Sequence, residues 1–156
     1  MFPIQPLNYW EDRALPGKWT NGAGADLHRR SLYTYWRRMA LHPTMEILDA
    51  PSRTICTVRR NLSNVPTQAL LTLNDPIFVE AAAAFASRLV REIPEGDVPR
   101  VERAFRIALG RYPDAAELSR FLDFLRLQRG ARRDESAAWH SVAAVLLNLD
   151  ETLCRP

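Results

Sequence analysis

From Asp75 onward, apolar residues recur at helical spacing in four stretches, and each stretch is bounded by residues that start or stop helices. The first stretch follows Asp75 and Pro76, a pair typical of an N-cap with proline in the first turn. It runs to about Glu92, after which proline and glycine residues interrupt the pattern. We therefore predict an amphipathic helix that begins after Asp75 and ends near Glu92.

Three more helices follow in the same half of the chain. Gly110 is placed to close the second, since glycine adopts the backbone conformation that often ends a helix. Asp114 and Glu117 resemble a capping box at the start of the third, and Ser136 is the expected N-cap of the fourth. The apolar stripes are Val101, Phe105 and Ala108; then Leu118, Phe121, Leu122 and Leu125; then Trp139, Val142, Leu146 and Leu149. Four amphipathic helices joined by short turns predict a small bundle.

The first 66 residues differ from the rest. They hold six of the eleven prolines, together with the turn-forming stretch "NGAG", so regular elements there should be few and short. We predict one mainly α domain, in which residues 1–66 form an irregular proline-rich wrap packed against a helical bundle of residues 67–156. Long irregular segments inside compact domains are often functional, so function is expected in the wrap.

The stretch "RRSLYTYWRR", residues 29–38, sets two arginine pairs around aromatic side chains. As a helix it places Leu32 and Trp36 on one face; as a strand, the same two residues share a face with Arg30 and Arg38. We predict the helix, because nothing beside the stretch signals a hairpin. A second arginine pair lies in "CTVRRN", residues 56–61.

Three interpretations of these arginines stay open. They form an internal network with carboxylates, or an anion or sugar site in which aromatic rings stack on the ligand, or a docking face for another protein domain. The candidate residues are Arg29, Arg30, Tyr33, Arg37, Arg59, Arg60, Asp49 and Asp75. We expect at least one of Arg29, Arg30, Arg59 and Arg60 to be largely buried and paired with Asp75 or Asp49, since a buried charge requires a partner.

Other site chemistry finds little support in the sequence. The histidines show no metal-ligand spacing, and the absence of Cys-x-x-Cys-His predicts no covalently bound haem and no cofactor in this chain. Cys56 lacks a neighbouring base, so no catalytic residues are assigned, and whether it pairs with Cys154 is left open. A net charge of +3 with interspersed acidic residues argues against nucleic-acid binding, and no apolar run is long enough to span a membrane.

Four blocks in this order resemble domain of unknown function 1553: "RRSLYTYWRR", "DAPSRTICTVRR", "NVPTQALLTLNDPIFVEAA" and "VLLNLDETL". The resemblance extends from about Pro6 to Arg155, and "GRYPDAAEL" also follows the family's turn before an acidic helix start. Val65, Thr67, Leu48 and His28 depart from the usual residues of the pattern.

The resemblance implies the C-terminal module of large planctomycete-type proteins associated with cytochrome c domains. It implies an exported protein, periplasmic or on the cell surface, whose upstream domains supply any c-type haem. We therefore expect a non-catalytic accessory module that docks onto the other domains of its parent protein. The alternative is part of an enzyme or a ligand site that acts on carbohydrate or on another anionic or polar substrate.

Overall fold

A computed structural model describes residues 2–6, 8–9, 19–36, 40–61, 63–131 and 134–154. Within these ranges the chain is mainly α-helical and contains no β-strand, as the sequence predicts. The helices are α1 (Pro43–Ile47), α2 (Pro66–Asn74), α3 (Pro76–Glu92), α4 (Asp97–Ala108), α5 (Ala115–Ala131), α6 (Glu135–Leu147) and α7 (Asp150–Leu153), with 3₁₀ turns η1 (Gly24–His28) and η2 (Ser31–Tyr33). The chain divides into two compact units, residues 1–63 and residues 64–156.

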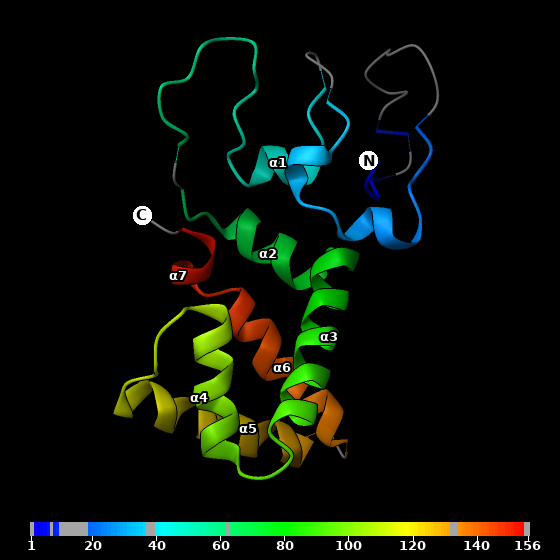
Figure 1. Cartoon of the computed structure of the whole chain (residues 1–156). Coiled ribbons are helices and arrows are strands. Elements are labelled where there is room, and N and C mark those ends of the chain that lie inside the picture. The colour runs from blue at the N-terminus through cyan, green and yellow to red at the C-terminus, as the bar shows by residue number, and fades with distance from the viewer. Residues whose placement is uncertain are drawn as a thin grey trace. The chain divides into compact units, whose positions relative to one another are not determined.

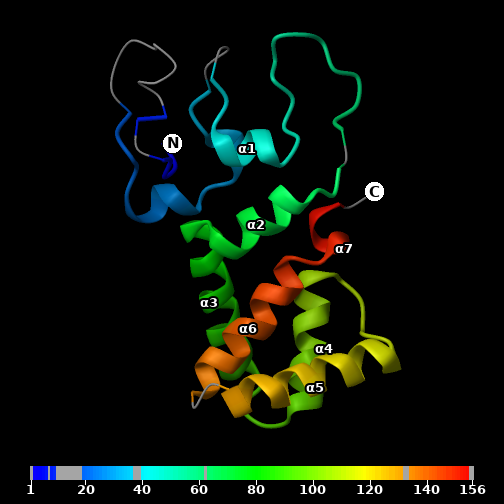
Figure 2. The same cartoon turned by 180° about the vertical axis from the view of Figure 1, so that it is seen from behind.

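The second unit is a bundle built around α6, which packs against α3, α4 and α5 (Figure 1). The reverse view in Figure 2 also shows α6 among these helices. Trp139, Val142 and Leu146 of α6 are completely buried, and they meet Leu89 of α3 and Phe105 of α4 in one apolar core. A helix that is apolar nearly all round requires neighbours on several sides, which explains the central place of α6.

Three predicted helix boundaries are confirmed by the local geometry. The Asp75 carboxylate accepts a hydrogen bond from the backbone N–H of Ile77, 2.9 Å away, and so caps α3. Gly110 follows the end of α4 with a positive φ of 77°. Asp114 and Glu117 form the reciprocal capping box, in which each side chain accepts the other residue's backbone N–H at 2.7 and 2.8 Å.

The start of α6 corrects the sequence prediction. Asp134, not Ser136, is the N-cap, and its carboxylate accepts the backbone N–H of Ser136 at 3.1 Å. A carboxylate suits this position at least as well as a hydroxyl, because it also meets the positive end of the helix dipole.

Helices α2 and α7 were not predicted. α2 ends one residue before α3 begins, and Asp75 between them is in an extended conformation. No single helix among the described residues is long and apolar enough to cross a membrane. Taken together, α2 and α3 have the required length and composition, but the two helices are bent by 65° relative to each other.

In the described residues of the first unit, the helical elements are η1, η2 and the short α1, and aromatic side chains hold the irregular segments together. Phe2 packs against Trp19 and Tyr35, with ring centroids 5.1 and 4.9 Å apart. Trp19 donates its indole N–H to the backbone oxygen of Pro3, and an imidazole nitrogen of His42 lies 3.0 Å from the backbone oxygen of Ile4. The start of the chain is thus tied to residues that lie far along the sequence.

Candidate functional site

The arginine–aromatic stretch is not an α-helix over its described residues, 29–36, so that prediction was wrong. A single 3₁₀ turn covers Ser31–Tyr33, and the backbone angles of Arg30 and Thr34 on either side of it are not helical. Aromatic and β-branched residues lose side-chain freedom in a helix, and three of them follow one another from Tyr33 to Tyr35. Tyr35 instead stacks on Phe2.

The candidate residues of this stretch lie on the surface. Arg29 forms an ion pair with Asp26 at 2.8 Å, and both side chains are more than half exposed. Arg30 and Tyr33 are exposed beside it. Arg37 lies outside the described residues.

The second arginine pair lies on a loop, residues 51–61, in which every residue is exposed. We call it the projecting loop, because it extends from α1 as an open arc (Figure 1). Asp49 fastens its base: the carboxylate accepts the backbone N–H and the hydroxyl of Ser63 at 3.0 and 2.5 Å. Arg60 donates a hydrogen bond to the backbone oxygen of Leu48. Both ends of the loop are therefore held next to the end of α1.

Two hollows open in the first unit. The first, of about 490 Å³, is lined by Ser31, Leu32, Trp36, Thr44, Met45, Leu48, Ala50, Pro51, Arg53 and Arg60. The second, of about 660 Å³, lies along the projecting loop, and its lining includes Asp49, Cys56, Arg59 and Arg60. Among the candidate residues, Asp49, Arg59 and Arg60 are thus brought together. Arg29, Arg30 and Tyr33 line neither hollow.

The expectation of a buried arginine among Arg29, Arg30, Arg59 and Arg60 was wrong, because all four are exposed. These residues lie in turns and in the projecting loop, where long charged side chains stay hydrated and need no buried carboxylate partner.

Among the described arginines, the buried one is Arg100 of α4, with only 5% of its surface exposed. Its Nε and Nη2 donate to the backbone oxygens of Ile93 and Pro94 at 2.9 and 2.7 Å, just after the end of α3. Its guanidinium also lies over the indole of Trp139, and Nη1 lies 3.6 Å from the Glu135 carboxylate. Arg100 therefore satisfies carbonyls that the end of α3 leaves without a helical partner.

Arg129 of α5 joins two further carboxylates. It donates two hydrogen bonds to Glu135 at 2.7 and 2.5 Å, and two to Asp97 at 2.6 and 2.8 Å. These bonds to Glu135 and Asp97 raise the pKa of Arg129, and the same contacts lower the pKa of both carboxyl groups. The indole N–H of Trp139 also donates to Glu135, at 2.9 Å. The starts of α4 and α6 are thus fixed to the end of α5.

Arg111 is the centre of a second network, near the end of α4. It makes two hydrogen bonds to Glu117 in the first turn of α5, at 2.8 and 2.7 Å, and also bonds to Glu151 of α7. The Arg111 guanidinium, helped by the backbone N–H of Asp114, lowers the pKa of Glu117 to about 2. The two arginine–carboxylate networks formed by Arg111 and Arg129 therefore lie in the second unit, at arginines that are not adjacent to another arginine.

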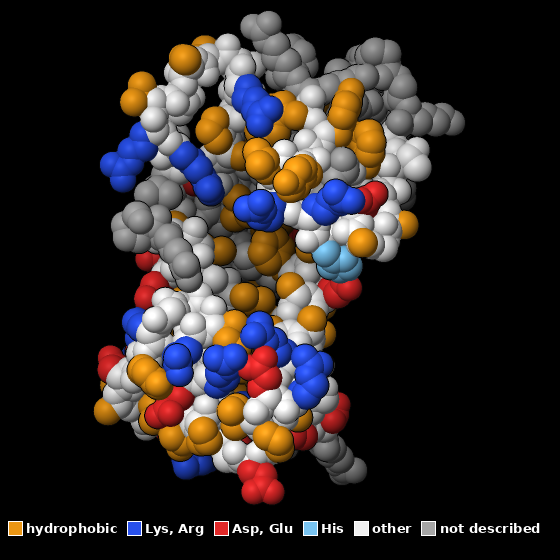
Figure 3. Space-filling model, in the orientation of Figure 1, with side chains coloured by type: hydrophobic (Ala, Val, Ile, Leu, Met, Phe, Trp, Pro, Cys, Tyr) orange, Lys and Arg blue, Asp and Glu red, His pale blue; other side chains and the backbone are white. Residues whose placement is uncertain are grey.

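Charge is divided unevenly along the chain. Residues 1–63 contain nine Lys and Arg against five Asp and Glu, whereas residues 64–156 contain twelve against thirteen. Figure 3 shows arginines interspersed with apolar side chains over the first unit, and arginines mixed with acidic side chains over the second. The described part of the chain contains no group of three or more His, Cys, Asp or Glu side chains that could hold a metal ion.

Sequence comparison shows the family. The sequence model of the family described as Protein of unknown function (DUF1553) matches residues 2–125. The chain belongs to this family. Comparisons with curated proteins and with solved structures each gave no significant match.

The DUF1553 match covers the whole described first unit, both hollows, and the second unit as far as α5. The block "VLLNLDETL" lies beyond the matched residues. In the fold it contacts the block that begins "NVPTQALLTLND". Asn64 donates to the Asp150 carboxylate at 2.7 Å, and the Thr72 hydroxyl donates to the amide oxygen of Asn148 at 2.9 Å. Two of the blocks that carry the resemblance to DUF1553 are therefore partners in one polar junction.

Proposed function

We propose that this chain is a non-catalytic docking module, which binds another protein through the projecting loop. The observation behind this proposal is the exposure of two β-branched apolar side chains on that loop. Ile55 is 75% exposed and Val58 is fully exposed, and Arg59 and Arg60 follow directly. Apolar side chains beside arginine are typical of the surfaces that proteins bury against one another.

The charge of the first unit supports an acidic partner surface. A positively charged patch speeds encounter with an acidic surface and disfavours basic ones. Given the family, the partner that we propose is another domain of a larger exported protein, one associated with cytochrome c, and any c-type haem belongs to that domain.

The competing function is a part of an enzyme, or a carbohydrate site, built on the arginine–aromatic stretch. It requires Arg29, Arg30, Tyr33 and Arg59 to line one cleft together with a free carboxylate. Arg29 is instead paired with Asp26, and of the four residues only Arg59 lines either of the two hollows described above. This arrangement favours the docking function.

A binding titration between this chain and the separately purified haem-bearing domain of its parent tests the proposal. We expect saturable binding, which weakens about tenfold or more when Ile55→Ser and Val58→Ser are combined, as for interface anchors. Leu127→Ser is the matched control, since Leu127 of α5 is 66% exposed in the second unit. The proposal is contradicted if the wild type, the double variant and Leu127→Ser bind with equal affinity, or if the wild type shows no saturable binding.

A further inference from the structure

The first hollow is lined by residues other than Ile55 and Val58, on which the proposed docking depends. Its volume of about 490 Å³ falls within the range of small-molecule sites. Apolar side chains form most of its lining, and Ile55 and Val58 are not among them. Arg53 and Arg60 add two cationic groups and Thr44 a hydroxyl. The lining is thus apolar with a few polar groups, as in sites that bind and orient small organic molecules.

Arg53 is fixed in place by an aromatic ring. The central carbon of its guanidinium lies 4.1 Å from the ring centroid of Trp36. Stacking of this kind uses the face of the guanidinium and leaves its N–H donors, which lie in the plane, able to bind an acceptor. Arg53 has no hydrogen bond or ion pair with any described residue. It therefore presents an oriented donor group at the hollow.

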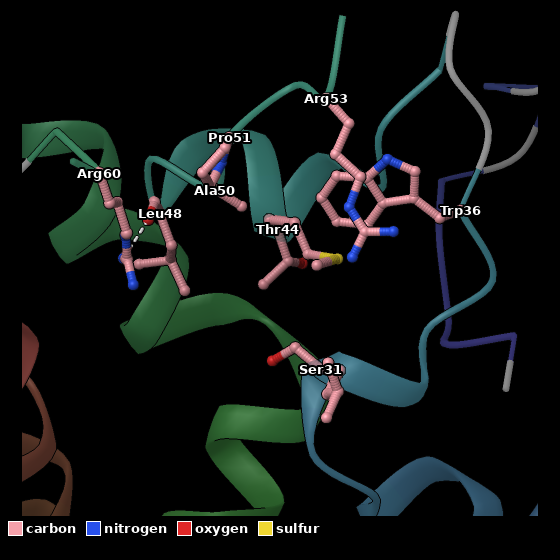
Figure 4. Close-up of a pocket in the computed structure, with 10 residues that line it drawn as sticks. Ser31, Trp36, Thr44, Leu48, Ala50, Pro51, Arg53 and Arg60 are labelled. Atoms are coloured by element: carbon pink, nitrogen blue, oxygen red, sulfur yellow. Dashed lines mark hydrogen bonds between the residues drawn. The ribbon is translucent and has the colours of Figure 1, made fainter. Parts of the chain in front are cut away.

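Arg60 is fixed by a different contact. One of its terminal nitrogens donates to the backbone oxygen of Leu48, which leaves the remaining N–H groups without a partner among the described residues. Figure 4 shows Arg53 and Arg60 on opposite sides of Thr44, with Leu48, Ala50 and Pro51 on the side of Arg60. The two guanidinium groups thus flank an apolar surface from two directions.

The lining also contains a buried donor without an acceptor. The indole Nε1 of Trp36 is buried and has no hydrogen-bond partner among the described residues. Buried polar groups of native proteins are nearly always paired, so such a group suits an acceptor atom supplied by a ligand. Its ring is the one on which Arg53 stacks.

We propose that this hollow binds an organic anion, namely a carboxylate attached to a flat apolar body. The carboxylate accepts the N–H groups of Arg53, a charge-assisted contact that the planar guanidinium can make with two parallel hydrogen bonds. The apolar body covers Met45 and Leu48, and Arg60 adds attraction from the far side of Thr44.

Two probes with the same ring system, one anionic and one neutral, test the proposal. Naphthalene-2-carboxylate and naphthalene-2-methanol are titrated into the chain, with calorimetry and tryptophan fluorescence as readouts. We expect the carboxylate to bind about tenfold or more tightly than the alcohol. Arg53→Gln and Arg60→Ala should each reduce carboxylate affinity about tenfold and leave the affinity for the alcohol unchanged. Arg53→Gln keeps a polar side chain of similar length beside Trp36, and circular dichroism verifies that each variant is folded.

Arg59→Ala is the matched control for Arg60→Ala. Arg59 is the exposed neighbour of Arg60 and lines only the second hollow, so its loss removes the same charge without touching this site. Equal affinity for the two probes would mean unspecific apolar adsorption and overturn the proposal. So would an equal effect of Arg59→Ala and Arg60→Ala, or the absence of saturable binding of the carboxylate. Failure here leaves the docking function intact, because that function depends on Ile55 and Val58.

Discussion

The guanidinium of Arg100 lies over the indole ring of Trp139, with its central carbon 4.8 Å from the ring centroid. Trp139 is completely buried and Arg100 nearly so, and they come from α4 and α6. Arg100 also donates to the backbone oxygens of Ile93 and Pro94, after the end of α3. One charged side chain therefore joins three helices of the bundle.

We predict that Arg100→Ala strongly destabilises the second unit. The substitution leaves two carbonyls without their donor and opens a space beside Trp139. Charge-assisted hydrogen bonds of this kind contribute about 1.5–3 kcal/mol, so the free energy of unfolding should fall by about 2–3 kcal/mol. Denaturant unfolding monitored by circular dichroism measures the change.

Two variants give that experiment its control. Arg120→Ala, at an exposed position of α5, should change stability by less than about 0.5 kcal/mol. Arg100→Lys should recover only part of the loss, because an ammonium group cannot copy the planar fork that reaches both carbonyls and stacks on Trp139. If Arg100→Ala and Arg100→Lys both unfold with the same free energy as the wild type, Arg100 does not stabilise the bundle.

The ion pair between Arg111 and Glu117 predicts a stability that depends on pH. The pKa of Glu117 is lowered to about 2 in the folded chain from an ordinary value of 4.5. A lowered pKa means that the folded state holds the proton more weakly than the unfolded state. The resulting stabilisation is complete above pH 4.5 and is lost as the pH falls toward 2.

Glu117→Gln isolates this contribution. The variant should melt below the wild type at pH 7, and the difference should shrink steadily between about pH 4.5 and pH 2. Thermal melts in a series of buffers at constant ionic strength measure both curves. A difference in Tm that stays constant across this range would contradict the prediction.

Helix positions in the second unit were largely predictable from sequence, because local signals coincide there with apolar periodicity. Asp75 before Pro76, Gly110 after α4, and the Asp114–Glu117 pair each act through backbone groups only a few residues away. α2 also begins with a proline, Pro66, but no side chain caps it. It buries Gln68 and Thr72 while Leu70 and Leu73 are exposed, which inverts the usual amphipathic pattern.

The arginines that matter to the bundle were not predictable from pairing in sequence. Adjacent arginines occur in residues 29–38 and 56–61, yet adjacency in sequence does not determine whether a side chain is buried. Arg100 is a single arginine, four residues before the buried Ala104, and so occupies the apolar face of α4. The four-residue spacing from Arg100 to Ala104 was the sequence signal that could have predicted its burial. The first hollow depends on Arg53 meeting Trp36 across 17 positions of irregular chain, a contact that no local pattern specifies.

The exposed arginines of the first unit yield the opposite prediction to Arg100. Arg30→Ala and Arg59→Ala should each change the free energy of unfolding by less than about 0.5 kcal/mol, as is usual for surface substitutions. Both side chains are exposed, so their loss leaves no buried group without a partner. Thermal melts decide the matter. A large loss of stability in either variant would show that the arginine is buried and paired, as first expected from the sequence.

The cap of α6 gives a direct comparison of two neighbouring polar residues. Asp134→Ala should cost about 1 kcal/mol, because the backbone N–H of Ser136 loses its acceptor. Ser136→Ala should be close to neutral, since Ser136 contributes its backbone rather than its hydroxyl to the cap. Urea unfolding of both variants measures the two values. The reverse order of effects would restore Ser136 as the cap.

A polar junction joins α2 to the end of α6. The Thr72 hydroxyl is buried and donates to the Asn148 amide oxygen at 2.9 Å, across 76 residues of chain. Thr72→Val keeps the shape of the side chain and removes the hydroxyl, which also lies near the backbone oxygens of Gln68 and Ala69. A double-mutant cycle with Asn148→Ala should give a coupling energy of about 1 kcal/mol, the typical net value of such a hydrogen bond.

A cycle is required here because Asn148 is also the C-cap of α6, and the single Asn148 variant therefore reports on more than this bond. The second contact of the same junction, from Asn64 to Asp150, is solvent-exposed and serves as the comparison. Asn64→Ala and Asp150→Ala should couple by less than about 0.5 kcal/mol, because water screens and replaces an exposed contact. If the Thr72–Asn148 cycle is additive, that hydrogen bond does not hold α2 to α6. If the exposed pair couples as strongly as the buried one, burial is not what gives the junction its strength.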